Sequence, residues 1–163
     1  MASFYWYERN PELLQAEKAA MQQFFPHFKL QTLDDGRLYW VGTLNPRGKA
    51  GGTWTLMAIY QHDHPNNDAR YGSSVRIYSI KPDLDELCRA AGSLPHVLVD
   101  EANHYYMCTS DRQYVKEGMH GDKKEYEATS AASSLAWAAK WIFIVEEWLE
   151  GELPTREVFA DVY

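Results

Sequence analysis

The sequence predicts one domain, residues 1–163, of the α+β class. Three observations predict it: a helical pattern near the N-terminus, four alternating runs joined by short turns, and a second helical pattern after a long polar stretch. The expected order is an N-terminal helix, a four-stranded antiparallel meander, a long loop and C-terminal helices. A chain of 163 residues suits one full hydrophobic core and leaves little room for another.

The first helix is expected to begin at Pro11. Asn10 can cap it, Pro11 suits the first turn and Glu12 favours the helix dipole. Apolar residues then recur at helical spacing until Pro26 ends the helix: Leu13, Leu14, Ala20, Met21 and Phe24.

The meander is predicted from alternating apolar and polar residues separated by turn residues. Asp34-Asp35-Gly36 is a strong hairpin signal between the first two runs, and Asn45-Pro46-Arg47-Gly48 follows the second. Short connections between neighbouring strands favour antiparallel pairing. The expected strands are 28–33, 38–44, 54–60 and 75–80.

The remaining elements follow Lys81-Pro82. Asp83 can cap a short helix that Gly92 closes. Residues 93–125 are expected to be mostly irregular, and loops of that length are typically functional or disordered. A long helix is predicted over 126–149, before Gly151 and Pro154.

Composition argues against several classes of partner. The net charge of −7 comes from 23 acidic and 16 basic residues mixed along the chain, and no basic patch predicts a nucleic-acid ligand. The first 15 residues do not resemble a signal peptide. The longest apolar stretch, 135–149, is interrupted by Lys140, Glu146 and Glu147, which argues against a membrane span. We therefore expect a cytoplasmic protein with reduced thiols.

Two cysteines are too few for a disulfide framework, so each was considered for chemistry. Cys88 shares the apolar face of the short helix with Leu84 and Leu87, which predicts a core residue. Cys108 precedes the polar residues Thr109 and Ser110, which favours an accessible, nucleophilic thiol. The alternative is a small buried residue beneath the preceding aromatic cluster.

Three further side chains are candidates for roles beside this thiol. His96 and His104 could orient or protonate a reacting group, although an isolated histidine is more often structural. Asp111, three residues after Cys108, could accept a proton from an attacking amine or simply cap the loop.

Metal and cofactor sites are not expected. His62-Asp63-His64 contains zinc-ligand types, but such a run at a strand end usually lies in a solvated turn. The glycines between Gly48 and Gly52 precede a strand and lack the lysine of a phosphate-binding loop.

Several short motifs resemble the ubiquitin-conjugating enzymes. They are Ile80-Lys81-Pro82, Leu94-Pro95-His96, Tyr105-Tyr106-Met107-Cys108-Thr109, and a helix with Trp137, Trp141 and Trp148. With the order of elements, they cover residues 10–151. The pattern Glu146-Glu147-Trp148-Leu149-Glu150-Gly151 looks closest to the bacterial members found in CBASS-type anti-phage operons.

The resemblance implies a ubiquitin-conjugating-enzyme-like fold and a cysteine-dependent acyl transferase of antiviral defence. Cys108 would carry the C-terminus of a partner protein as a thioester and pass it to an amine, without a cofactor. The implied partner is a bacterial cyclic-oligonucleotide synthase (CD-NTase) or a ubiquitin-like protein, with an activating enzyme where one is required. His96 would then be architectural.

One departure leaves alternatives open. Eukaryotic members of the family carry His-Pro-Asn before the cysteine, and that asparagine helps to stabilise the oxyanion, whereas here Val97 and Leu98 follow His96. Asn103, His104, Ser110 or Asp111 could replace it. A catalytically inactive binding module of the same fold is the alternative function, and a thiol peptidase using Cys108 with His96 or His104 is a weaker one.

Overall fold

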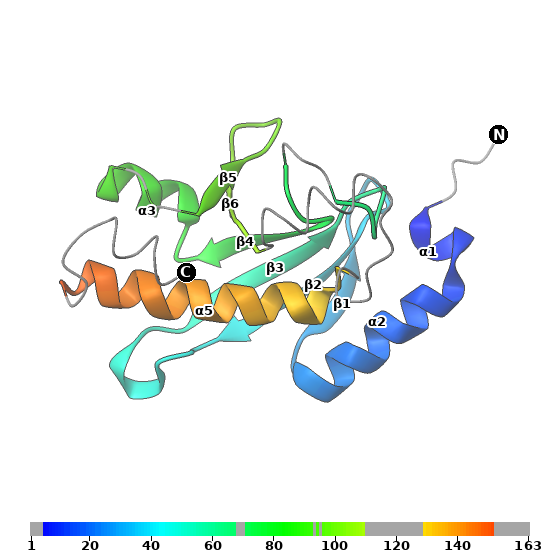
Figure 1. Cartoon of the computed structure of the whole chain (residues 1–163), viewed down its shortest axis with the longest axis horizontal. Helices are drawn as coiled ribbons and strands as arrows, with labels where there is room; N and C mark the ends of the chain where they lie inside the picture. The colour runs from blue at the N-terminus through cyan, green and yellow to red at the C-terminus, as the bar shows by residue number, and fades with distance from the viewer. Residues whose placement is uncertain (1–4, 68–70, 93, 95, 110–128, 152–163) are drawn as a thin grey trace.

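The computed structural model describes residues 5–67, 71–92, 94, 96–109 and 129–151. Within them, four α-helices accompany six strands in one antiparallel sheet (Figure 1). The helices are α1 (Trp6–Arg9), α2 (Pro11–Phe24), α3 (Leu84–Ala91) and α5 (Ala131–Leu149). The strands are β1 (Lys29–Thr32), β2 (Leu38–Leu44), β3 (Trp54–Tyr60), β4 (Val75–Lys81), β5 (Val97–Val99) and β6 (Tyr105–Met107). The α+β class is confirmed.

The predicted meander is present, but the sheet is larger than expected. β1 to β4 pair in sequence order, while β6 adds to β4 and β5 forms the far edge, giving the order β1-β2-β3-β4-β6-β5. The expectation of four strands was therefore wrong for the described residues. β5 and β6 have three residues each, too few to show alternation within a polar stretch.

Local signals explain where the early elements begin and end. The Asn10 side chain accepts a hydrogen bond from the Leu13 N–H, so α2 begins at Pro11 as predicted. Gly36, with φ of +90°, forms the turn between β1 and β2, a conformation that glycine adopts without strain. The one-turn helix α1 was not predicted.

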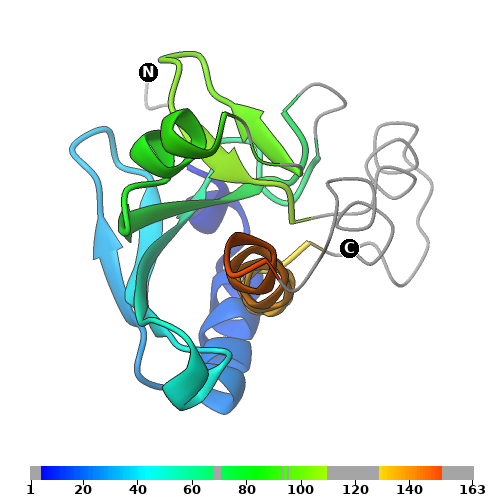
Figure 2. The ribbon, with the colours of Figure 1, turned by 90° about the vertical axis from the view of Figure 1, so that its left-hand side faces the viewer.

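The core lies between α5 and one face of the sheet. Figure 2 shows α5 nearly end-on, on the same side of the strands as α2. Trp141 of α5 meets Trp54 of β3 edge to face, with ring centroids 6.0 Å apart. The fully buried apolar residues facing each other include Leu56, Ala58, Val75 and Ile77 from the sheet and Leu135, Ala138, Ile142 and Val145 from α5.

The long helix begins later than predicted. Ser130 is its N-cap and forms a reciprocal capping box with Ser133, so Thr129 and Ser130 precede the helix. The predicted residues 126–128 lie outside the described residues. No described helix has the combination of length and apolar character needed to cross a membrane.

Candidate functional site

The thiol of Cys108 lies directly after β6. This cysteine is partly exposed and reduced, whereas Cys88 on α3 is buried in the core, as predicted. Burial also raises the pKa of the Cys88 thiol, which makes it a poor nucleophile. Of the two sulfur atoms, only that of Cys108 has an environment suited to reaction with another protein.

Backbone contacts hold Cys108 in place. The adjacent Met107 pairs with Ile77 of β4 and with Val97 of β5. The Cys108 N–H donates to the carbonyl of His96 over 2.9 Å. His96 has a φ of +57°, an uncommon conformation for a residue other than glycine. The structure thus brings His96 and Cys108 together, with His96 positioning the strand through its main chain.

His104 lies at the other end of β6. Its Nδ1 is 2.8 Å from Asp85 Oδ2, and its N–H donates to Asp100. The hydrogen bond with the Asp85 carboxylate, and the charge of that group, raise the pKa of the exposed His104 side chain. Four residues of strand span about 13 Å, so His104 and Cys108 are not brought together.

The pair formed by His104 and Asp85 joins α3 to the hairpin between β5 and β6. Asp85 also accepts the N–H of Tyr105 over 2.7 Å. Burial of Asp85 opposes its ionisation, but its bonds with Tyr105 and His104 outweigh this and lower its pKa. A cleft of about 320 Å³ adjoins this pair, lined in part by Tyr78, Ile80 and Leu84.

The other predicted residues differ in their placement. Asp111 and Ser110 lie outside the described residues. Asn103 is exposed at the tip of the hairpin with a φ of +67°, at the same end as His104. Thr109, the residue after Cys108, is buried, and its hydroxyl has no hydrogen-bond partner among the described residues.

A buried arginine beside this region was missed from the sequence. Arg76 on β4 is only 7% exposed, and its guanidinium lies 5.0 Å from the ring centroids of both Tyr71 and Tyr106. Two bonds of 3.1 and 3.3 Å join it to the Glu101 carboxylate. Burial alone would lower the pKa of Arg76, yet the bonds with Glu101 raise it, so the cation is retained.

Tyrosines complete this Arg76 cluster. The Tyr78 hydroxyl donates to Asp100 over 2.8 Å, and burial together with that bond raises the pKa of Tyr78 to about 12. The Tyr106 hydroxyl donates to the carbonyl of Tyr71. The cluster therefore holds the β5–β6 hairpin, which carries Cys108, against β4. In the sequence, the only signal for this cluster was an arginine within a largely apolar strand.

Comparison with protein families identifies the chain. The family model described as "Type II CBASS E2 protein" matches residues 17–153, which include every predicted site residue. The chain belongs to this family. Neither the curated proteins nor the solved structures gave a match.

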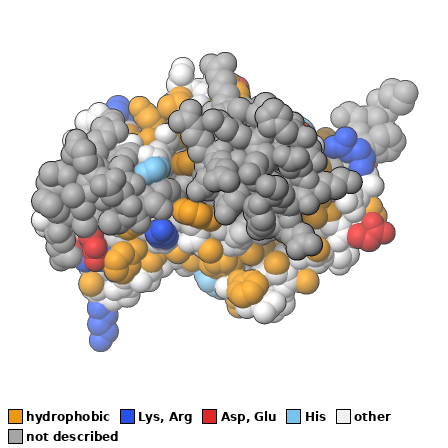
Figure 3. Space-filling model, in the orientation of Figure 1, with side chains coloured by type: hydrophobic (Ala, Val, Ile, Leu, Met, Phe, Trp, Pro, Cys, Tyr) orange, Lys and Arg blue, Asp and Glu red, His pale blue; other side chains and the backbone are white. Residues whose placement is uncertain are grey.

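Membership makes this chain a CBASS-associated, E2-like protein of anti-phage defence, as the resemblance of its short motifs predicted. The matched segment begins at Glu17, whose side chain is buried. On the face that carries α5, the visible Lys and Arg side chains of the described residues stand singly rather than in a patch (Figure 3).

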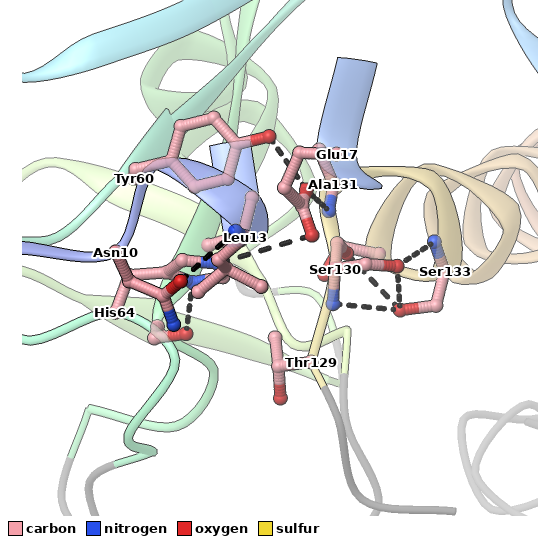
Figure 4. A network of polar contacts seen from close by, with 12 residues as sticks. Asn10, Leu13, Glu17, Tyr60, His64, Thr129, Ser130, Ala131 and Ser133 are labelled. Atoms are coloured by element: carbon pink, nitrogen blue, oxygen red, sulfur yellow. Dashed lines mark hydrogen bonds and ion pairs between the residues drawn. The ribbon is translucent and has the colours of Figure 1, made fainter. Parts of the chain in front are cut away.

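A second buried polar network fixes the start of α5 in this E2-like protein (Figure 4). The Glu17 carboxylate, on α2, accepts bonds from the Tyr60 hydroxyl at 2.6 Å and from the Ala131 N–H at 2.8 Å. Trp40 Nε1 donates to the same Tyr60 hydroxyl. One acidic side chain thus connects α2, the sheet and the N-terminus of α5.

His64 completes this Glu17 network, contrary to expectation. The sequence predicted a solvated turn at 62–64, but His64 is 2% exposed, with Nδ1 2.8 Å from Ser74 Oγ and Nε2 3.9 Å from Glu17 Oε2. Burial lowers the pKa of His64 to about 3, so it is neutral at physiological pH. Burial also raises the pKa of Glu17. The sequence could not show that Trp6 and Tyr60 pack around this imidazole.

Proposed function

We propose that this E2-like protein carries the C-terminal carboxyl group of a partner protein as a thioester on Cys108 and transfers it to an amine. The observation that carries the proposal is a partly exposed thiol at a fixed strand end, held by the His96 carbonyl within the matched family segment. Free cysteine has a pKa near 8.5, so about 3% is thiolate at pH 7, and sulfur is strongly nucleophilic.

The first step is acyl transfer onto Cys108. Its thiolate attacks the carbonyl carbon of an activated C-terminus, either an acyl adenylate or a thioester on an activating enzyme. A new carbon–sulfur bond forms, and the donor's carbon–oxygen or carbon–sulfur bond breaks to release the nucleotide or the donor thiolate. The partner that fits the family is a bacterial cyclic-oligonucleotide synthase or a ubiquitin-like protein.

The second step is transfer to an amine, most simply a lysine. The amine nitrogen forms a bond with the carbonyl carbon, the carbon–sulfur bond breaks, and Cys108 returns as thiolate. The nitrogen loses a proton to a base, and Asp111 is the proposed acceptor because it lies three residues after the thiol. His104 is too far along β6 for this role, and we propose that it positions the hairpin instead.

The second candidate function is a binding module of the same fold without chemistry. The observation that favours it is the sequence His96-Val97-Leu98, which lacks the asparagine of many relatives. A binding module would still expose the hairpin surface but would need no reactive sulfur at position 108.

Variants at the two cysteines distinguish these functions. Wild type, Cys108→Ala, Cys108→Ser and the control Cys88→Ala are each incubated with the partner protein, ATP and the activating enzyme, then run on non-reducing gels. We expect a thiol-sensitive adduct with wild type and with Cys88→Ala, none with Cys108→Ala, and a thiol-resistant ester with Cys108→Ser. Partner binding without any adduct from wild type would establish the binding module instead.

A further inference from the structure

The register of β4 and β6 indicates that Arg76 is the residue across from Cys108 on the neighbouring strand. Met107 is the residue opposite Ile77, so one step along the two antiparallel chains Arg76 comes opposite Cys108. The Cys108 N–H points to His96 on the β5 side, so Cys108 and Arg76 would form a non-hydrogen-bonded pair. Such non-hydrogen-bonded pairs have the closer spacing, with Cα atoms about 4.5 Å apart.

Side-chain alternation places both residues on the same face of the sheet. Ile77 and Met107 point into the core, with 0% and 1% exposure, so their neighbours Arg76 and Cys108 point to the opposite face. Directly opposite residues on one face have Cβ atoms about 4.5–5.5 Å apart. The side chains of Arg76 and Cys108 therefore start from neighbouring positions on the same face of the sheet, and that of Arg76 is largely desolvated.

One nitrogen of the Arg76 guanidinium is left without a partner among the described residues. Both terminal nitrogens bind Glu101, but the buried Nε has no hydrogen-bond partner among the described residues. Buried donors without a partner are rare in native structures. Nε is nearer the backbone of β4 than the terminal nitrogens, because it comes before them along the side chain.

The charge of Glu101 does not cancel that of Arg76 at this site. The Arg76 side chain is 8% exposed, whereas that of Glu101 is 62% exposed and screened by solvent. Among the described residues, the other ionisable groups near Arg76 are Tyr71 before β4, Tyr78 on β4, Tyr106 on β6 and Asp100 in the hairpin, while His96 binds Cys108 through its carbonyl. Asp100 is occupied by the Tyr78 hydroxyl and by backbone N–H groups.

We propose that the Arg76 cation stabilises the thiolate of Cys108. The same stabilisation serves both steps of the proposed function, on which this part rests: the thiolate attacks in the first step and is the leaving group in the second. Arg76 would then stabilise the negative charge on sulfur from the neighbouring strand. The loop of this site lacks the asparagine of the eukaryotic conjugating enzymes.

The test measures the reactivity of the thiol in the protein alone. The rate of alkylation by iodoacetamide is recorded from pH 6 to 10, with peptide mass spectrometry to assign the product to Cys108 rather than Cys88. Arg76→Met should raise the midpoint of the pH profile by about one unit, lowering the rate at pH 7 about tenfold. Arg76→Lys keeps the cation and should stay closer to wild type.

Two further variants test whether the shift in the midpoint is specific to Arg76: one should shift it in the opposite direction and one should leave it unchanged. Glu101→Gln removes the counter-charge and should lower the midpoint, the reverse of Arg76→Met. Glu150→Gln removes the carboxylate of another arginine pair, 2.7 Å from Arg47, and should leave the midpoint unchanged. An unchanged midpoint in folded Arg76→Met, or an unchanged or raised one in Glu101→Gln, would overturn the proposal. If Arg76→Met does not fold, the midpoint measured for Glu101→Gln decides whether the proposal holds.

The outcome is separable from that of the thioester experiment. Alkylation needs no partner, so a shifted midpoint without any protein adduct would keep the role of Arg76 and refute the carrier function. An adduct on wild type with no shift in any variant would do the reverse.

Discussion

The Glu17 network and the Arg76 cluster each surround one buried charge, but they differ in the exposure of its partners. Each has a charged side chain less than 10% exposed that interacts with at least one tyrosine. The partners of Glu17 are themselves buried, namely Tyr60, the Ala131 N–H and His64. Arg76 instead binds an exposed carboxylate. The comparison separates a buried charge whose partners lie in the core from a buried charge whose partner lies at the surface.

The largest expected effect comes from removing the acid of the Glu17 network. Glu17→Ala leaves the Ala131 N–H and the Tyr60 hydroxyl without their acceptor, so the free energy of unfolding should fall by about 3 kcal/mol. Urea unfolding at pH 7 measures this. Glu12→Ala, at an exposed position of the same helix, is the control and should cost less than about 1 kcal/mol. A loss from Glu17→Ala no larger than the control would mean that the network does not hold α5.

The next effect is a loss of stability at acidic pH, which this network should cause. His64 has a folded pKa of about 3, below its unfolded value, so unfolding takes up a proton below pH 6.5. Stability should be full above pH 6.5 and fall by up to about 1.4 kcal/mol per pH unit as the pH drops toward 4. The raised pKa of Glu17 opposes this, since the folded state then also takes up a proton.

Variants separate the histidine from other acid effects. His64→Gln should flatten the profile measured by urea unfolding at pH 7.0, 5.5 and 4.5, while His27→Gln, at an exposed histidine, should keep the wild-type slope. Equal slopes in wild type and His64→Gln would show that this imidazole is not responsible.

The smallest effect concerns the hairpin that bears Cys108. His104 has a raised folded pKa, so its ion pair with Asp85 is fully formed below pH 6.5 and is lost as the pH rises through the folded pKa. An NMR titration of the His104 ring should give a midpoint above 6.5, and Asp85→Asn should lower it. A midpoint unaffected by Asp85→Asn would remove the proposed link between α3 and the hairpin.

Much of the fold could be predicted because its signals are local. Asn10 and Asp83 cap α2 and α3, and Gly92 closes α3 with a φ of +85°. The boundaries of β2 and β3 were also predicted correctly. In the candidate site, Cys108 and His96 were identified from short motifs. The three-residue strands beside them were not, although Val97–Val99 and Tyr105–Met107 carry β-forming residues on both sides of a turn.

By itself, the sequence determined the types of the longer elements and the core role of Cys88, because caps, turns and periodicity act over a few residues. Short motifs also gave the family resemblance centred on Cys108. Only the tertiary structure decided that His64 is buried beside Glu17, and that Arg76 meets Glu101 next to the Ile77–Met107 pair. These contacts join residues at least 25 positions apart. They arise from strand pairing and core packing, which leave no periodic pattern in the chain.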